Sequence, residues 1–205
     1  MNASYHHGDL KTVLLAFARE QLERASLDGL SMREMAKAVG VSHTAAYRHF
    51  QDKRALLEAV AVQGFEEMVA AGRTAEDTAP SDARAKLKSL GLAYVRFGLR
   101  HPRRLAHMFN AVSNPQATAE LMHVGAQLFE LLFQLVREGQ QQEVFRGDDA
   151  RQMTHACWAM VHGLSSLLSI SILQTPEVDL NAQMLSAGQS LEVFLDGLCT
   201  KRVKI

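Results

Sequence analysis

The segment from Ser31 to Lys53, SMREMAKAVGVSHTAAYRHFQDK, constrains the fold more than any other part of the chain. It holds two short apolar patterns at helical spacing, separated by Gly40, and each follows a serine that can cap a helix. Glu34 stands three residues after Ser31, the spacing of a capping box, and glycine accepts the left-handed backbone that ends many helices. The segment therefore predicts two short helices joined by a tight turn, with Asp52 capping a third helix.

The second helix of this segment is expected to have two chemically different faces. Ala46 and Phe50 are four residues apart, so they share a small apolar face that we expect to be buried. The opposite face carries hydroxyl, phenol, guanidinium and imidazole groups, which suit the phosphate oxygens and base edges of DNA. The candidate DNA-binding residues are Ser31, His43, Thr44, Tyr47, Arg48, His49 and Lys53. On spacing alone, an ordinary helical bundle with exposed polar side chains is an equal alternative.

Three stretches near the N-terminus carry a family resemblance that favours DNA binding. They are the predicted helix ending near Arg24, the stretch DGLSMREMAKAVGVS at 28–42, and the stretch AAYRHFQDKRALL at 45–57. With them, the segment from Tyr5 to about Leu57 resembles the DNA-binding domain of the TetR family of transcriptional regulators. The resemblance implies a three-helix reading head at residues 1–55.

The resemblance also implies roles for single residues. In the family, the residues at the positions of Tyr47 and Lys53 commonly touch phosphates. The position after the tyrosine is often aromatic in the family and is Arg48 here. Because arginine can bond guanine through two hydrogen bonds, we expect Arg48 to contact bases directly.

The composition is that of an ordinary folded protein and gives little further evidence about a partner. Of the 205 residues, 47% are apolar and 21% are charged, and the net charge is zero. Residues 1–55 carry an excess of two positive charges, which is weak support for phosphate binding. Neither a signal-like N-terminal stretch nor an apolar run of about 20 residues is present, so we expect a cytoplasmic protein.

Helical periodicity continues through the rest of the chain, so we predict an all-α fold. Residues 56–205 are expected to form a second domain for ligand binding and dimerisation. A long helix near 52–71 leads into it, and the stretch GRTAEDTAPSD at 72–82 is expected to be a linker. Prolines at predicted helix boundaries divide the remainder. Together with the 52–71 helix, helices near 81–100, 102–110, 115–140, 148–173 and 179–199 make up the expected six-helix second domain.

The second domain resembles one TetR C-terminal subgroup, which is named for a Trp-His-Gly signature. The resemblance rests on YVRFGLRHPRRLAHMF at 94–109 and on Trp158, His162 and Gly163. It implies a cavity for a small, often apolar molecule. The candidate lining residues are Leu92, Tyr94, Phe97, Met108, Phe109, Met122, Phe129, Phe133, Trp158 and His162. The competing interpretation is that these residues are simply core, since aromatic and Met stripes usually are.

The last two long helices are the expected dimer surface. Each is apolar over a wider arc than one intramolecular contact needs, and small residues on the first allow close helix approach. The family resemblance implies a symmetric homodimer with a four-helix interface. The candidate interface residues are Met160, Leu164, Leu167, Leu191, Phe194 and Leu195.

These features predict a ligand-responsive transcriptional repressor bound to a near-palindromic DNA operator. The rival hypothesis is an all-helical enzyme or small-molecule carrier that uses the same cavity. We find no nucleophile and base at motif spacing and no phosphate-binding glycine loop, so we expect no catalysis and no cofactor. The histidines match no common zinc spacing, and Cys157 and Cys199 match no metal or redox motif, so we expect no metal site.

Overall fold

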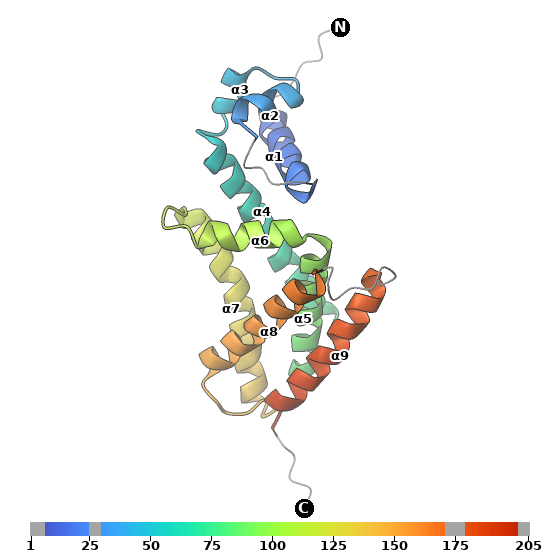
Figure 1. Cartoon of the computed structure of the whole chain (residues 1–205). Coiled ribbons are helices and arrows are strands. Elements are labelled where there is room, and N and C mark those ends of the chain that lie inside the picture. The colour runs from blue at the N-terminus through green and yellow to red at the C-terminus, as the bar shows by residue number, and fades with distance from the viewer. Residues whose placement is uncertain (1–6, 25–29, 171–178, 201–205) are drawn as a thin grey trace, which may run out of the picture. The chain divides into compact units, whose positions relative to one another are not determined.

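The computed structural model describes residues 7–24, 30–170 and 179–200, and these residues form nine α-helices (Figure 1). The helices are α1 (His7–Arg24), α2 (Met32–Ala38), α3 (His43–Tyr47), α4 (Lys53–Thr78), α5 (Ala83–Arg100), α6 (Pro102–Val112), α7 (Ala119–Gln141), α8 (Ala150–Leu168) and α9 (Leu180–Leu198). The predicted all-α class is confirmed. The helix predicted to reach residue 173 ends at Leu168, and positions 171–173 lie outside the described residues.

The linker predicted at 72–82 is wrong over most of its length, because α4 continues to Thr78. Gly72 is a packing residue here. A methyl group at that position would lie only 2.8 Å from Leu90 and 2.9 Å from Leu131. The hydroxyls of Thr74 and Thr78 donate to carbonyls one turn back, which satisfies these polar groups within the helix. Gly72 therefore marks a close contact between helices, whereas Thr74 and Thr78 lie on the solvent-exposed end of α4.

The described residues divide into two compact units. One unit runs to Gly64 and includes Arg103–His123, and the other comprises Phe65–Pro102 and the residues from Val124 onwards. This division differs from the expected boundary after residue 55, because α6 and the start of α7 pack with the first half of α4. Assignment of DNA binding to 1–55 and of ligand binding to 56–205 stays a prediction.

In the first unit, α1, α2 and α3 surround one apolar core together with the start of α4 (Figure 1). Leucines from α1 and methionines from α2 supply half of its buried members, as their helical spacing predicts. Its buried members are Leu10, Leu14, Leu15, Ala18, Leu22, Met32, Met35, Ala36, Ala46, Phe50, Leu56 and Val60. The predicted buried face formed by Ala46 and Phe50 is confirmed.

The start of α4 is tied to the segment between α6 and α7 by a buried carboxylate. Glu58 is only 8% exposed. Its carboxylate accepts a hydrogen bond from Arg54 at 2.9 Å and another from the Thr118 backbone N–H at 2.5 Å. His107 on α6 contacts the Leu57 carbonyl at 2.8 Å. These contacts hold the helix that follows the reading head against α6 and the first residues of α7.

In the second unit, α5 packs along both α8 and α9 (Figure 1). Arg84 of α5 reaches Glu192 at 2.6 Å and Asp196 at 2.5 Å on α9. The loop after α7 is fastened to the end of α9 by backbone bonds of 3.0 Å from Arg146 to Leu198 and from Thr200 to Val144. These contacts hold together the helices that supply the apolar core of the second unit.

Replacing Glu58 with Ala is expected to loosen the start of α7. The Thr118 amide would lose its acceptor, and a partly buried hydrogen bond to a charged group contributes about 1.5–3 kcal/mol. Hydrogen exchange at the Thr118 and Leu121 amides should then become at least about tenfold faster. Glu66→Ala, which removes an exposed carboxylate from the same helix, is the control. Equal protection of these amides in both variants would contradict the assigned role of Glu58.

Candidate DNA-binding surface and ligand pocket

The turn between α2 and α3 has the predicted geometry. The Ser31 hydroxyl accepts from the Glu34 N–H at 3.2 Å, and the Glu34 carboxylate accepts from the Ser31 N–H at 2.7 Å. These bonds lower the pKa of Glu34. Gly40 has a φ of +77°, the left-handed conformation expected of it. Because the Ser31 hydroxyl is engaged in the cap, the structure gives this residue a role in shaping the motif.

Helix α3 is shorter than predicted. It begins after Ser42, whose hydroxyl accepts from the Ala45 N–H at 3.2 Å, and it ends at Tyr47. Arg48 caps its C-terminus, and the next backbone bonds close tight turns. Phe50, only 4% exposed, anchors the end of this turn in the core. Phe50 is therefore buried on the same side of the segment as Ala46, although the regular helix ends at Tyr47.

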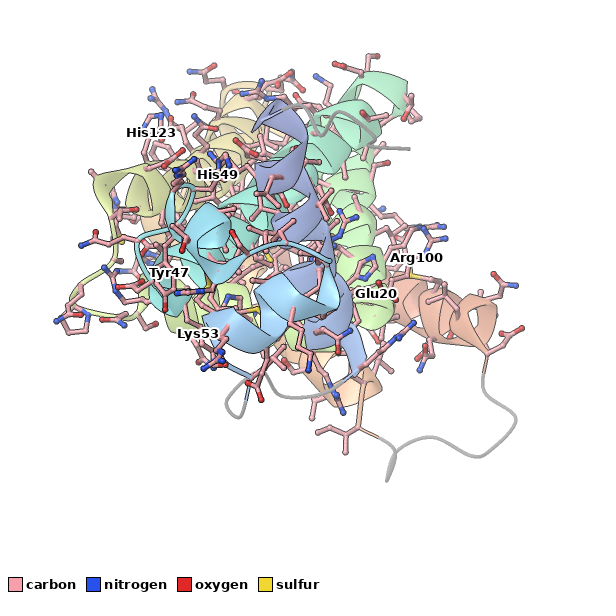
Figure 2. The ribbon with its side chains drawn as sticks, turned by 90° about the horizontal axis from the view of Figure 1, so that it is seen from above. Glu20, Tyr47, His49, Lys53, Arg100 and His123 are labelled. Carbon is pink, nitrogen blue, oxygen red and sulfur yellow. The ribbon has the colours of Figure 1, made fainter. Side chains whose placement is uncertain are left out.

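The polar side chains of this region lie on the outer side of α3 and at the start of α4. His43, Thr44, Tyr47 and Arg48 are exposed, whereas His49 and Lys53 are half-buried. The Tyr47 ring is 48% exposed and meets His43 edge to face, with 6.3 Å between ring centroids. In Figure 2, Tyr47 and Lys53 lie on one side of this helical group and Glu20 lies on the other. The predicted DNA-binding residues are therefore exposed or half-buried, and their contact with DNA stays a prediction.

Lys53 occupies the first turn of α4, directly after the capping residue Asp52. The Asp52 carboxylate accepts from the Ala55 N–H at 2.7 Å, which confirms the predicted cap. A cation in the first turn of a helix is opposed by the helix dipole. A phosphate bound near this helix start would offset that cost, since it interacts favourably with both Lys53 and the dipole.

The second unit contains an apolar pocket between its helices. Its lining residues come from α4, α5, α7, α8 and α9: Met68, Gly72, Leu87, Leu90, Gly91, Ala93, Tyr94, Leu128, Leu132, Cys157, Trp158, Val161, Leu191, Phe194 and Leu195. The structure places two of the predicted ligand residues, Tyr94 and Trp158, on this lining. The free volume of about 40 Å³ holds little more than a few waters, so the pocket is nearly closed in this conformation.

Most of the other predicted ligand residues lie elsewhere. Met108 is buried in the first unit, where its side chain fills the space beside Gly64. Met122 is 51% exposed. Phe129 and Phe133 lie beneath the Arg151 guanidinium, outside the lining. The remaining predicted residues absent from the lining are Leu92, Phe97, Phe109 and His162. Helical spacing showed that these residues share apolar faces, but it does not show which neighbour each face meets.

A hydrogen-bonded group of side chains adjoins the pocket. The Tyr94 hydroxyl lies 2.8 Å from Nδ1 of His162, and the Trp158 side chain also bonds to Tyr94. Burial raises the pKa of Tyr94 and lowers the pKa of His162. Burial also raises the pKa of the Cys157 thiol to about 12. All three groups are therefore held in their uncharged forms at neutral pH.

The predicted dimer residues divide between the interior and the surface. Leu191 and Leu195 are 3% and 1% exposed and line the pocket, so their assignment to an intermolecular surface is wrong. Phe194 also lines the pocket, and Met160 and Leu164 are half-buried. The large apolar residues exposed on and beside α8 and α9 are Leu167, Ile170, Leu185 and Val193. The sequence analysis did not include Leu185 and Val193 among the interface residues, because α9 has apolar residues on both faces and spacing alone does not show which face is exposed.

The described residues contain no helix that is long and apolar enough to cross a membrane. They also contain no group of three or more His, Cys, Asp or Glu side chains placed to hold a metal ion. Both cysteines are free thiols, with Cys157 buried and Cys199 half-buried.

Comparison with known proteins agrees with this architecture. Residues 14–60 match the model of bacterial regulatory proteins of the tetR family, and residues 87–185 match the tetracyclin repressor-like C-terminal domain. The HTH-type transcriptional regulator UidR of Escherichia coli (strain K12) is 25% identical over 190 residues, which cover 93% of each chain. The more specific resemblance to the Trp-His-Gly subgroup stays a prediction.

Solved structures give the same result. A protein of unknown function from Rhodococcus sp. RHA1 is 34% identical, with a TM-score of 0.84 over 97% of this chain and 100% of its own. A regulatory protein in the tetR family from Rhodococcus RHA1, 19% identical, shares the fold with a TM-score of 0.72 over 93% of this chain and 98% of its own. With both of its parts matched by family models and a helix-turn-helix of the expected geometry, the chain belongs to the TetR family of transcriptional regulators.

Proposed function

We propose that this regulator is a repressor that leaves a near-palindromic operator when a small, largely apolar molecule enters the second unit. The observation that carries the proposal is the two-sided character of α3. Ala46 is fully buried, whereas Tyr47 and Arg48, its neighbours in sequence, are exposed. Because Ala46 faces the core, Tyr47 and Arg48 point toward solvent and remain available to bind DNA. Because its target is the DNA of the cell, we place its action in the cytoplasm.

Two groups of DNA contacts follow from the chemistry of the side chains. Tyr47, His49 and Lys53 are proposed to bind phosphates, which position the protein without reading sequence. Arg48 is proposed to read a base, helped by Thr44 and His43 from the first turn of α3. Arg48 directly follows the last residue of α3, so its long side chain can still extend from this helix toward a base although the helix has only five residues.

We propose a homodimer in which a second copy covers the outer faces of α8 and α9. Leu167, Leu185 and Val193 are more than half exposed there. Gly163, Gly188 and Gly197 have no neighbouring atom within 4 Å of the position that a side chain would occupy, so a partner helix can approach closely. A helix-turn-helix dimer meets half-sites about 34 Å apart, which makes the operator near-palindromic.

Release from DNA requires only that the effector binds one conformation better than the other. A coupling of about 1–3 kcal/mol between the pocket and the operator is typical of such regulators. Helix α4 is the proposed transmitter, because its first half belongs to the reading-head unit and its second half supplies Met68 and Gly72 to the pocket. The effector would then change the spacing of the two reading heads.

The alternative of an enzyme or a carrier rests on the same pocket. No charged side chain lines it, and its two ionisable members, Tyr94 and Cys157, are held neutral by burial. General acid-base chemistry near neutral pH needs a group that titrates there. This lining therefore favours binding over catalysis.

Selection of bound duplexes from a random pool should yield a near-palindromic operator. Against that operator, Arg48→Ala is expected to lose at least about tenfold in preference over random DNA, since a bidentate base contact contributes about 1–3 kcal/mol. Arg73→Ala, which removes an exposed charge from the second unit, should keep the preference. Failure of the wild-type protein to select any sequence would refute the regulator mechanism, whereas an unchanged Arg48→Ala preference would refute only the role of Arg48.

Val193→Glu is expected to weaken the dimer, because the side chain is 77% exposed in one chain and would be buried against the second copy. Sedimentation equilibrium should show at least about tenfold weaker self-association. Met122→Glu places the same charge on another exposed apolar site, outside α8 and α9, and should leave the association unchanged. Equal association of both variants would exclude this face of α9 from the interface.

A further inference from the structure

We propose that the pocket of the second unit selects uncharged, largely apolar molecules that carry a hydroxyl group, and that Tyr94 is the residue that recognises this hydroxyl. The inference rests on the proposed effector-binding function and specifies the chemical class of the effector. It depends on the charge of the lining and on the hydrogen bonds that Tyr94 already makes.

The lining excludes ions. Its residues are Leu, Val, Met, Ala, Gly, Phe, Tyr, Trp and Cys, without one Asp, Glu, Lys, Arg or His. An ion entering this pocket would lose its hydration and meet no opposite charge, which is costly in an apolar environment. A carboxylate or ammonium ligand is therefore selected against, whereas the same carbon skeleton in neutral form is compatible with the apolar lining once the pocket opens.

Tyr94 is the polar centre of the lining. It lies at 8% exposure on α5, and its hydroxyl contacts two residues of α8. The Trp158 indole has only a donor to offer, so it donates its N–H to the Tyr94 oxygen. The neutral His162 ring accepts the Tyr94 proton at Nδ1, 2.8 Å away, in the tautomer that carries its own proton on Nε2, and this is the tautomer that the proposal requires. With His162 in this tautomer, Tyr94 donates to His162 and accepts from Trp158.

With one lone pair bonded to Trp158 and its proton given to His162, the Tyr94 oxygen can accept one further hydrogen bond. A ligand hydroxyl can donate that bond, whereas an ether or ketone oxygen cannot. The apolar remainder of the ligand would lie against leucines and Met68, whose flexible side chain can move to enlarge the nearly closed cavity. The pocket therefore distinguishes donors from acceptors as well as neutral molecules from ions.

A series of single-ring probes tests this specificity. The probes are 4-ethylphenol, 4-ethylanisole, ethylbenzene, 4-ethylbenzoate and 4-ethylbenzylammonium. Trp158 is the only tryptophan of the chain and lies on the pocket, so its fluorescence reports binding directly. We expect 4-ethylphenol to bind about tenfold more tightly than ethylbenzene or 4-ethylanisole. Both ions should bind at least about 100-fold more weakly than the phenol.

Tyr94→Phe removes the hydroxyl and keeps the ring. It should weaken 4-ethylphenol binding about tenfold and change ethylbenzene binding less than about twofold, so that the difference isolates one hydrogen bond. Retained ethylbenzene binding also shows that the variant is folded. Leu128→Met, a change of similar volume on the same lining, is the matched control and should preserve the ranking of the probes.

Three results would overturn the inference: no binding by any probe, preferred binding of an ion, or an unchanged affinity of Tyr94→Phe for 4-ethylphenol. None of these bears on operator binding, which is measured separately by duplex selection. A protein that selects an operator but prefers 4-ethylbenzoate would keep its proposed function and refute the hydroxyl specificity. A protein that ranks the probes as expected but selects no duplex would support the hydroxyl specificity and refute the proposed function as a regulator.

Discussion

Burial of Ala46 and Phe50 in the core of the first unit is the contact on which the DNA-binding surface depends. The two side chains turn one face of the α3 segment inward, toward leucines of α1 and methionines of α2. Once that face is buried, the neighbouring Tyr47 and Arg48 must point outward, since residues on opposite sides of so short a helix cannot share a direction. Helix α3 itself is only five residues long, and Phe50 lies just beyond its end.

The helix that follows connects this surface with the rest of the protein. Helix α4 starts at Lys53, a proposed phosphate contact, and its second half supplies Met68 and Gly72 to the pocket lining. Its first half is fastened by Glu58, a buried carboxylate whose acceptors are used by Arg54 and Thr118. Removing Arg54 or the Thr118 contact would leave the buried Glu58 carboxylate without one of its partners, which costs more than the bond itself contributes. Glu58, which has a structural role, and Lys53, which is proposed to bind phosphate, therefore lie only about one and a half turns apart on the same helix.

The pocket shows how few polar groups are needed to give an apolar cavity chemical selectivity. Tyr94, Trp158 and His162 come from only two helices, α5 and α8, which pack closely together. In the proposed arrangement their hydrogen bonds are directional, so together they leave one acceptor position on the Tyr94 oxygen. The surrounding leucines contribute binding energy without direction, whereas the absence of charged groups from the lining determines which ligands are rejected. The specificity of the pocket is therefore the difference between its affinity for a neutral hydroxyl-bearing ligand and its affinity for an ion or an ether of the same size.

Local sequence determined the elements of this protein, and tertiary packing decided which faces became functional. The serine and aspartate caps, the left-handed Gly40 and the buried face of α3 follow from interactions within a few residues, so the sequence predicted them and the family correctly. The destinations of Met108, Phe129, Leu191 and Leu195 depend on contacts between helices far apart in the chain. Periodicity shows that a helix has an apolar face, but when several helices are apolar on two sides, only their packing decides whether that face meets the core, the pocket or a second copy.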